Sequence, residues 1–257
     1  MQLKVITFNI RYDKPDPGEN NWQVRKKAIA SLIDRYSPDL IGTQEGKAHQ
    51  LLDLHRMLPA YQSVGSSRTP DGAGEYCAIL YRRDRCQCLQ TNEFWLSDTP
   101  EIPGSVGANW GNHLPRIVTS SVFALTNQDK KVTLSNTHFD YDSTKARDLG
   151  AKLIHSRLSK FNWQDSYLFL TGDFNSPPDS FPRQTLANIP LHDALAGREL
   201  NQQMTYHEFT GKAFAAIDTI YYDKRVKLNQ VKIDTSRWEK VFPSDHFPVI
   251  AEFEQNE

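Results

Sequence analysis

Short runs of apolar residues, separated by turn-forming residues, recur along the chain. Runs of this length are typical of buried β-strands, especially where they are rich in Val, Ile, Phe and Tyr. The pattern predicts strands at residues 4–10, 40–44, 75–81, 85–94, 117–125, 131–138, 167–170, 217–222, 227–233 and 247–253.

Three other segments carry apolar residues at the three- and four-residue spacing of an amphipathic helix. They predict helices at residues 22–35, 49–58 and 144–161, the last with Phe161 on its inner face. Strands interleaved with helices favour a layered α/β fold. No Ser/Gly-rich linker, low-complexity tract or short repeat interrupts the pattern, so we expect a single domain spanning residues 1–257.

The charges nearly cancel. Lys and Arg number 30 and Asp and Glu number 31 among the 257 residues, which gives a formal net charge of −1. Such a balance argues against a large nucleic-acid footprint, although it permits a local basic patch. The basic runs at residues 25–27 and 82–85 are more typical of solvated faces than of a nucleic-acid patch.

Other features concern the cellular compartment. The longest unbroken apolar run, residues 76–81, is too short for a membrane-spanning helix. The N-terminus lacks the basic start and apolar core of a signal peptide. The three cysteines Cys77, Cys86 and Cys88 are too few and too clustered for a disulfide framework. We therefore expect a reduced, cytoplasmic protein.

Polar residues lie at or near the ends of the predicted strands, where α/β folds usually place their chemistry. These residues are Asn9, Glu45, His138, Asp173 and Asp218. A carboxylate that ends a buried strand requires a partner, which for Glu45 is either a divalent cation or simply a Lys or Arg. The oxygen-rich set of Glu45, Asp245, Asn9, Asp173 and Asn175 fits Mg²⁺ or Mn²⁺.

Asp173 and Asn175 are two residues apart and follow a very apolar strand and Gly172. In an extended conformation both side chains face one side, where they supply one proton acceptor and one donor to a phosphate oxygen. The alternative is an Asx-type turn that caps the strand.

Two histidines and a buried aspartate suggest further chemistry. His138 can donate a hydrogen bond to a phosphoryl oxygen, although a lone histidine is usually structural. Asp218 lies inside an apolar strand and requires a partner, and a histidine is a natural one because the carboxylate fixes its tautomer. His246, at the start of the last strand, is the predicted partner. Arg11 could clamp a phosphate, but in isolation it is more typical of a structural residue.

Taken together, these segments resemble the endonuclease/exonuclease/phosphatase superfamily. The resemblance spans nearly the whole chain, and the six motifs occur in family order. They are Phe8-Asn9-Ile10-Arg11, Gln44-Glu45, Thr137-His138, Gly172-Asp173-Phe174-Asn175, Ile217-Asp218 and Ser244-Asp245-His246. The segments at residues 74–81 and 94–97 resemble a bacterial branch whose substrates are mostly unassigned. The resemblance implies a four-layer α/β sandwich of two packed, mostly antiparallel sheets flanked by helices.

The resemblance also implies a role for each site residue. Glu45 would be the principal ligand of Mg²⁺ or Mn²⁺, with Asn9 and Asp245 beside it. Asp173 would orient and deprotonate the attacking water. The phosphoryl group would be contacted by Asn175, by His138 and by His246, which Asp218 would orient. Arg11, Arg116 and Asp140 are the predicted substrate-binding residues.

These roles predict a metal-dependent phosphoesterase that acts on a small phosphorylated molecule or a nucleic-acid end. The alternatives are a DNA or RNA endonuclease and, in another class, a catalytically silent binding module on the same fold. Some apurinic endonucleases have an acidic residue in place of Arg11 and a Tyr in place of His138, which argues against a DNA-repair role. Trp22, Trp95 and Trp110 would either wall a narrow pocket or belong to the core.

Overall fold

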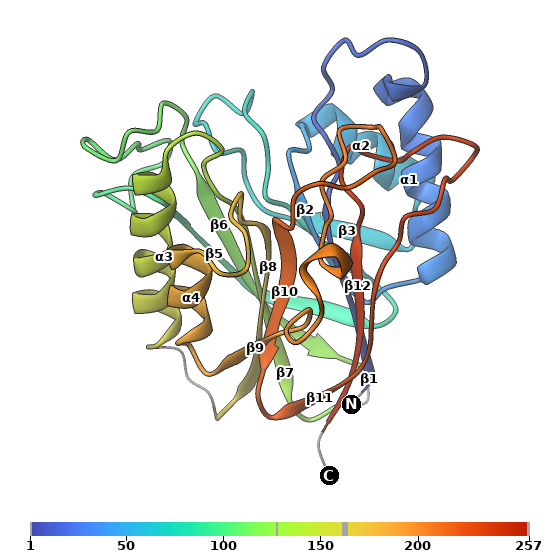
Figure 1. The fold of residues 1–257 in the computed structure, drawn as a ribbon. Helices are drawn as coiled ribbons and strands as arrows, with labels where there is room; N and C mark the ends of the chain where they lie inside the picture. Colours follow the sequence, from blue (N-terminus) through green and yellow to red (C-terminus); the bar gives the residue numbers. More distant parts are fainter. Residues whose placement is uncertain (1, 127, 161–163, 256–257) are drawn as a thin grey trace.

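The computed structural model describes residues 2–126, 128–160 and 164–255. Two six-stranded sheets pack face to face, and helices cover the outer face of each sheet (Figure 1). The order of the layers is helix, sheet, sheet, helix, which confirms the predicted α/β sandwich.

The first sheet contains strands from both ends of the chain. Its order is β11-β12-β1-β2-β4-β3, and only the β1–β2 pair is parallel. Its strands are β1 (Gln2–Asn9), β2 (Leu40–Gln44), β3 (Tyr61–Val64), β4 (Ile79–Arg82), β11 (Val226–Ile233) and β12 (Val249–Gln255).

The second sheet is built from six strands that are consecutive in the chain. Its order is β5-β6-β7-β8-β10-β9, and only the β7–β8 pair is parallel. Its strands are β5 (Cys86–Trp95), β6 (Ile117–Leu125), β7 (Lys131–His138), β8 (Ser166–Asp173), β9 (Leu191–Asp193) and β10 (Asp218–Asp223).

The described residues form four α-helices, which make up the outer layers. On the first sheet lie α1 (Trp22–Tyr36) and α2 (Ala48–Met57), and on the second lie α3 (Thr144–Leu158) and α4 (Phe181–Ala187) (Figure 1). Side-chain caps define the starts of α1 and α3, because Asn21 and Ser143 each accept a hydrogen bond from a backbone N–H in the first turn. Two short 3₁₀-helices, Gly18–Asn20 and Leu200–Gln202, lie in loops.

The alternation of side chains along each strand separates the core into layers. In β1, Leu3 and Val5 pack in the cluster between the two sheets, whereas Ile6 and Phe8 pack against α1 and α2. Because successive side chains point to opposite faces, Asn9 lies on the same face as Leu3 and Val5, at the end of the strand. The inter-sheet face is therefore apolar along most of β1 and polar at its end.

The second sheet has the same pattern of apolar side chains followed by a polar one on the inter-sheet face. Val132 and Leu134 of β7 pack between the sheets, and His138 follows them on the same face. Tyr167 and Phe169 of β8 do likewise, and Asp173 follows on their face. The apolar side chains of this pattern hold the sheets together, and the polar ends gather at one edge of the sandwich.

The strand and helix bounds differ from the predicted ones mainly at the ends. The strand expected at residues 75–81 begins only at Ile79, because Tyr76 makes isolated bridges to Gly46 and Ser67 instead of pairing in a ladder. Strands β3 and β9 and helix α4 were not predicted, since three to seven residues are too few to show a period. Helix α3 ends at Leu158, and Phe161 lies outside the described residues.

The three tryptophans belong to the core, which was the second of the two alternatives. Trp22 and Trp110 lie in the buried clusters beneath the outer helices, and Trp95 packs on Cys77 and Ile117. Arg25, expected on a solvated face, is completely buried. Among the described helices, none has the length and apolar character needed to cross a membrane.

Candidate active site

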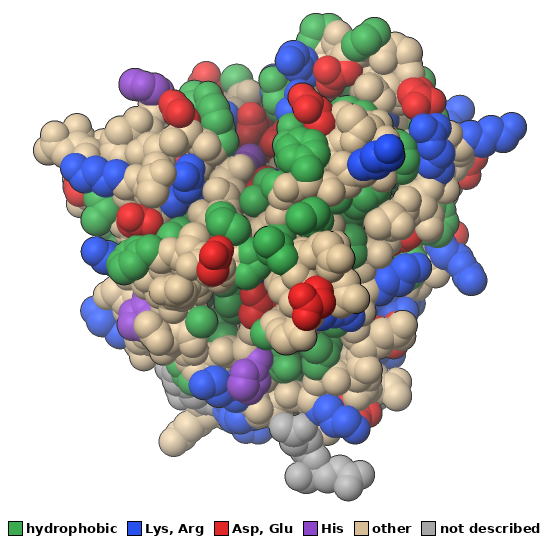
Figure 2. All heavy atoms as spheres, in the orientation of Figure 1, with side chains coloured by type: hydrophobic (Ala, Val, Ile, Leu, Met, Phe, Trp, Pro, Cys, Tyr) green, Lys and Arg blue, Asp and Glu red, His purple; other side chains and the backbone are tan. Residues whose placement is uncertain are grey.

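The polar strand ends meet in a hollow between the two sheets. In the second sheet, His138, Asp173 and Asp218 are neighbours across β7, β8 and β10, because Asp173 pairs in register with each of the other two. Asn9 and Glu45 approach from the first sheet. Figure 2 shows acidic side chains and a histidine at the floor of this hollow.

Asn9 connects the two sheets at the floor of the site. Its Nδ2 donates to Glu45 Oε1 at 2.9 Å and to Asp173 Oδ2 at 3.0 Å. Its Oδ1 accepts a hydrogen bond from the backbone N–H of Arg11 at 3.0 Å. The amide NH₂ group, which orients carboxylates, therefore faces the site, and the amide oxygen faces the turn that follows β1.

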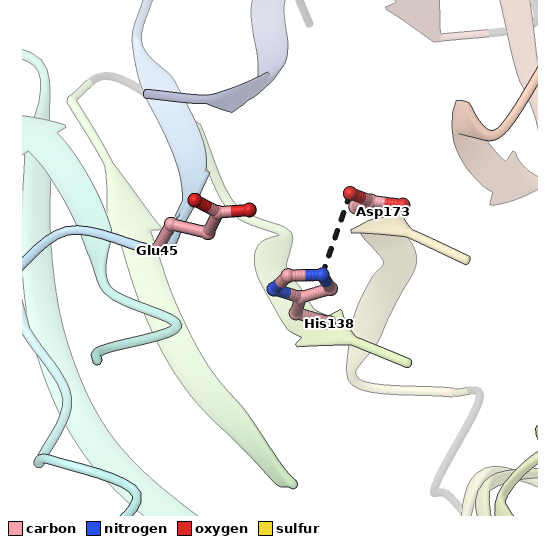
Figure 3. Close-up of side chains that lie close together, drawn as sticks. All are labelled: Glu45, His138 and Asp173. Carbon is pink, nitrogen blue, oxygen red and sulfur yellow. Dashed lines mark ion pairs between the residues drawn. The ribbon is translucent and has the colours of Figure 1, made fainter. Parts of the chain in front are cut away.

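Glu45 leaves the end of β2 in a left-handed backbone conformation with φ of +67°. Figure 3 shows its carboxylate extending toward His138 and Asp173. One ligating atom from each of these three side chains lies within 4.8 Å of the others. The second oxygen of Glu45, Oε2, accepts from the backbone N–H of Tyr12 at 3.1 Å. The group can hold a metal ion.

Asp245 brings a further carboxylate from the segment before β12. Ser244 anchors this segment, since its Oγ donates to the backbone carbonyl of Asn9 at 2.6 Å. Burial raises the pKa of Asp245, and the negative charge of Glu45 raises it further. Arg11 Nη1 lies 3.6 Å from Asp245 Oδ2 and 3.9 Å from Glu45 Oε2, so one cationic group already faces both carboxylates.

His246 and Asp218 form the predicted pair. His246 Nδ1 donates to Asp218 Oδ2 at 2.9 Å, which confirms the expected partner for the buried aspartate. Burial disfavours the charged imidazolium, but the Asp218 carboxylate outweighs this effect and raises the pKa of His246 to about 10. At neutral pH His246 is therefore a cation whose Nε2 faces the hollow, 3.8 Å from Asp173 Oδ2.

Asp173 and His138 have opposite protonation preferences. Burial and the adjacent Asp218 charge raise the pKa of Asp173 to about 7. Burial, together with the positive charges of Arg116 and Arg68, holds the pKa of His138 well below its usual range. His138 is thus a neutral imidazole at neutral pH, with Nε2 3.4 Å from Asp173 Oδ2.

Asn175 lies at the turn after β8. Its backbone N–H donates to Asp173 Oδ1 at 3.0 Å, so the Asx-type turn considered as an alternative is present. The side chain nevertheless points into the site, where Nδ2 lies 3.1 Å from His138 Nε2 and donates to the carbonyl of Phe139 at 3.0 Å. The left-handed backbone of Asn175, with φ of +46°, accompanies this orientation.

Arg116 and Asp140 lie beside His138 as a buried ion pair. Arg116 Nε donates to Asp140 Oδ2 at 3.3 Å. The other oxygen, Asp140 Oδ1, accepts from the backbone N–H groups of Asp142 and Ser143. Both oxygens of Asp140 are thus engaged by protein donors. The exposed ring of Tyr141 lies over the Arg116 guanidinium at 5.8 Å.

The sequence analysis missed two neighbours of the His246–Asp218 pair. Thr205 Oγ1 donates a short hydrogen bond to Asp218 Oδ2, the same oxygen that His246 uses. The ring of Tyr206 packs against the His246 ring with a centroid distance of 4.8 Å. These residues lie in an irregular loop, and the isolated bridge between Tyr206 and His246 is what places them there. No periodic pattern could have indicated them.

A small hollow adjoins Glu45 and His138 and is closed by Arg68, Glu75 and Arg116. In the wall of this small hollow, Arg68 and Glu75 form a bidentate ion pair with two hydrogen bonds. A larger hollow of about 530 Å³ lies at the strand edges around Tyr81, Cys86 and Cys88, and none of the residues described above lines it. The chemistry is therefore concentrated at the strand ends.

Comparisons with known proteins identify the family of the chain. Residues 6–246 match the endonuclease/exonuclease/phosphatase family. An uncharacterized protein of Acanthamoeba polyphaga mimivirus is 32% identical over 197 residues, which cover 72% of this chain and 71% of that protein.

Solved structures from Bacteroides are similar over the whole fold. The endonuclease/exonuclease/phosphatase from Bacteroides vulgatus is 32% identical, with a TM-score of 0.90 and 100% of both chains covered. The mannosyl-6-phosphatase from Bacteroides thetaiotaomicron is 29% identical, with a TM-score of 0.88, over 98% of this chain and 99% of that one. The chain therefore belongs to the endonuclease/exonuclease/phosphatase family, whose members are hydrolases of the phosphoesterase and nuclease type.

Proposed function

We propose that this enzyme hydrolyses a phosphoester of a small molecule, with Mg²⁺ or Mn²⁺ as cofactor. The observation that carries the proposal is the hydrogen-bonded junction at which Asn9 holds Glu45 from one sheet and Asp173 from the other. At this junction the Glu45 carboxylate, which would bind the metal, lies beside the Asp173 carboxylate, which would activate the water. The similarity to a mannosyl-6-phosphatase supports a small phosphorylated substrate.

The residues at the site fit a hard divalent cation. Glu45 and Asp245 supply carboxylate oxygens, the ligands that Mg²⁺ and Mn²⁺ prefer. Burial raises the pKa of Asp245, and the negative charge of Glu45 adds to this effect, so a bound cation would favour the ionised form of both carboxylates. When bound, the cation supplies positive charge to the phosphoryl oxygens and the leaving oxygen. Since the Asn9 amide NH₂ faces Glu45, we assign Asn9 the task of orienting the ligands.

We assign the role of general base to Asp173. Its pKa of about 7 matches the requirement that a base be ionised near neutral pH and still accept a proton. The Asn9 NH₂ group and the backbone N–H of Asn175 hold its two oxygens in place. In this position Asp173 would orient a water for in-line attack on phosphorus and take its proton.

The phosphoryl group would be held by donors around Asp173. The charged His246 would donate from Nε2, with Asp218 fixing its tautomer through Nδ1. The Asn175 amide and the neutral His138 would contact other phosphoryl oxygens from the opposite side. Such fixed donors stabilise the negative charge that develops on the oxygens during the transfer.

The predicted substrate-binding residues divide into two groups. Arg116 lies beside His138 in the wall of the hollow, and we propose that it contacts the phosphate. Asp140 would orient Arg116, because its oxygens are used within the protein. The charge of Arg11 is directed at Glu45 and Asp245, so we propose that it balances these ligands.

The net charge and the cysteines of the protein bear on its substrate and on its cellular location. The net charge of −1 argues against a large basic footprint for long nucleic acid, and Arg25 is buried and cannot contribute to one. The three cysteines are free thiols, which is in keeping with the reduced cytoplasmic location that we propose.

Substitution of the principal ligand tests the proposal. Purified enzyme is assayed with Mg²⁺, Mn²⁺ or a chelator against sugar phosphates, nucleotides, inositol phosphates and oligonucleotides. The Glu45→Gln variant should lose turnover and bind Mn²⁺ more weakly while keeping its circular dichroism spectrum. Glu252→Gln, at a surface ion pair with Lys4, should leave both properties unchanged. Unchanged metal affinity and turnover in Glu45→Gln would refute the metal assignment.

A further inference from the structure

Arg25 lies about one turn into α1, is fully buried, and forms hydrogen bonds to four backbone carbonyls. Its Nε donates to the carbonyl of Asn20 at 2.7 Å. Its Nη1 donates to the carbonyls of Ile10 at 2.8 Å and Pro243 at 2.9 Å, and Nη2 donates to the carbonyl of Arg11 at 3.2 Å. One guanidinium thus joins the start of α1 to the nearby turn after β1 and to a segment 218 residues further along the chain.

The first of these segments is the turn after β1. The backbone N–H of Arg11 holds the Oδ1 atom of Asn9, and the backbone N–H of Tyr12 holds Oε2 of Glu45. Arg11 has a left-handed φ of +55°, which is unfavourable for a residue with a side chain. The two hydrogen bonds from Arg25 to Ile10 and Arg11 compensate for this conformation.

The second segment carries the residues before β12. Pro243 directly precedes Ser244, Asp245 and His246, and Arg25 holds the Pro243 carbonyl with the same Nη1 that holds Ile10. Ser244 Oγ adds a direct link to the carbonyl of Asn9. The end of β1 and the segment that carries Asp245 are therefore fixed against one another through a single nitrogen of Arg25.

The charge of Arg25 acts on the same region. Burial lowers the pKa of this guanidinium to about 10, and the nearby carboxylate of Asp245 opposes the shift. Arg25 thus stays charged at neutral pH. Within the described part of the chain Arg25 has no ion pair. Its guanidinium instead faces the four carbonyls and the rings of Trp22 and Phe209, and the Asp245 carboxylate acts on it at longer range.

We propose that Arg25 is a positioning residue of the metal site. It holds the turn after β1 and the 243–246 segment in the register at which Glu45 and Asp245 present their carboxylates to one cation. The proposal rests on the metal dependence proposed above and adds a residue that contacts neither the cation nor the substrate.

The test compares metal affinity with stability. Mn²⁺ binding to the chelator-treated protein is measured by calorimetry for the wild type, Arg25→Met and Arg25→Lys. Ile154→Ala, which removes a fully buried side chain from α3 on the opposite outer layer, controls for lost stability. Lys27→Met, at an exposed position of α1, controls for lost charge. Melting temperatures are recorded for every variant.

Arg25→Met should bind Mn²⁺ at least about tenfold more weakly, a free-energy change of about 1.4 kcal/mol. The two control variants should bind within about twofold of the wild type, and Arg25→Lys should recover part of the loss because it keeps the charge and some donors. The weak binding should appear in turnover as a higher Mn²⁺ requirement, with wild-type KM for substrate at saturating metal.

Two results would overturn the role of Arg25. One is wild-type Mn²⁺ affinity in folded Arg25→Met, or in Arg25→Lys if the Met variant fails to fold. The other is an equal loss of affinity in Ile154→Ala at a matched fall in melting temperature. Absence of Mn²⁺ binding by the wild type would instead overturn the proposed metal dependence, and the role of Arg25 with it.

Discussion

At the scale of single residues, His246 shows how a neighbouring charge sets a protonation state. Its pKa is about 10 in the folded protein and about 6.5 when the chain is unfolded. Because the folded value is higher, the pair with Asp218 contributes its full stability below about pH 6.5. That contribution is lost as the pH rises from about 6.5 toward 10.

Removal of the Asp218 charge should therefore destabilise the protein most at low pH. We expect Asp218→Asn to lower the free energy of unfolding by about 3–5 kcal/mol near pH 6, since it leaves a buried charge unpaired. The loss should shrink toward pH 10. Denaturant unfolding of the metal-free protein at several pH values measures this. The exposed Asp84→Asn change serves as the control, and a loss independent of pH would contradict the assigned role.

Residues differ in how far the sequence could indicate them. The Asp218–His246 pair follows from a general rule, because a buried carboxylate needs a partner and the motif order supplied one. Arg25 follows from no such rule. Its neighbours Lys26 and Lys27 suggest a solvated face, and only the complete fold brings the carbonyls of Ile10 and Pro243 around it.

At the scale of elements, a buried polar network ties the two sheets together below the site. Asn136 of β7 donates to the carbonyls of Thr43 and Ala78 and accepts from Gln44 Nε2 and Thr171 Oγ1. The sheets come close here because β2 carries a glycine. A Cβ at Gly42 would lie 2.0 Å from Thr171 Oγ1 and 2.6 Å from Asn136 Oδ1, so any other residue would displace these side chains.

Loss of the Asn136 side chain should weaken the docking of the sheets. Asn136→Ala leaves several buried donors and acceptors without partners, and we expect a loss of roughly 2–4 kcal/mol in the free energy of unfolding. Equilibrium denaturation measures it, with Asn92→Ala at an exposed position of β5 as the matched control. Equal stability of the two variants would show that the network contributes little.

Strands with several alternating apolar residues could be predicted from the sequence, whereas the shortest strands could not. The apolar runs of β1, β7 and β8 each end in a polar residue on the same face, so the pattern indicated both the strand and its site residue. The strands β3 and β9 have no such run. They form because the edges of β4 and β10 supply hydrogen-bonding partners, which is tertiary information.

At the scale of the whole molecule, charge bears on the size of the substrate. Binding of long DNA releases counterions with a logarithmic salt slope of about −0.9 per phosphate contact. The net charge of −1 argues against the dense basic face that many such contacts would need. We expect hydrolysis of small phosphate esters that depends weakly on salt, and slow nicking of plasmid DNA.

Assays of both substrates across a salt series test whether the enzyme prefers small esters or DNA. Efficient nicking with a steep salt slope, and no activity on small esters, would favour an endonuclease.

In the sequence, the strands of the second sheet lie between the N-terminal and C-terminal strands of the first. This order has a consequence for synthesis on the ribosome. The strands of the second sheet span residues 86–223 without interruption, whereas the first sheet lacks its inner strand β12 until residues 249–255 have been made. At about 5–20 residues per second, all strands of the second sheet have been synthesised seconds before β12 is available to pair with β1. Asp245 and His246 directly precede β12 and take their places when it docks. We therefore expect a nascent or truncated chain that lacks β12 not to cleave phosphoesters, because the strand that fixes Asp245 and His246 beside the other site residues is missing.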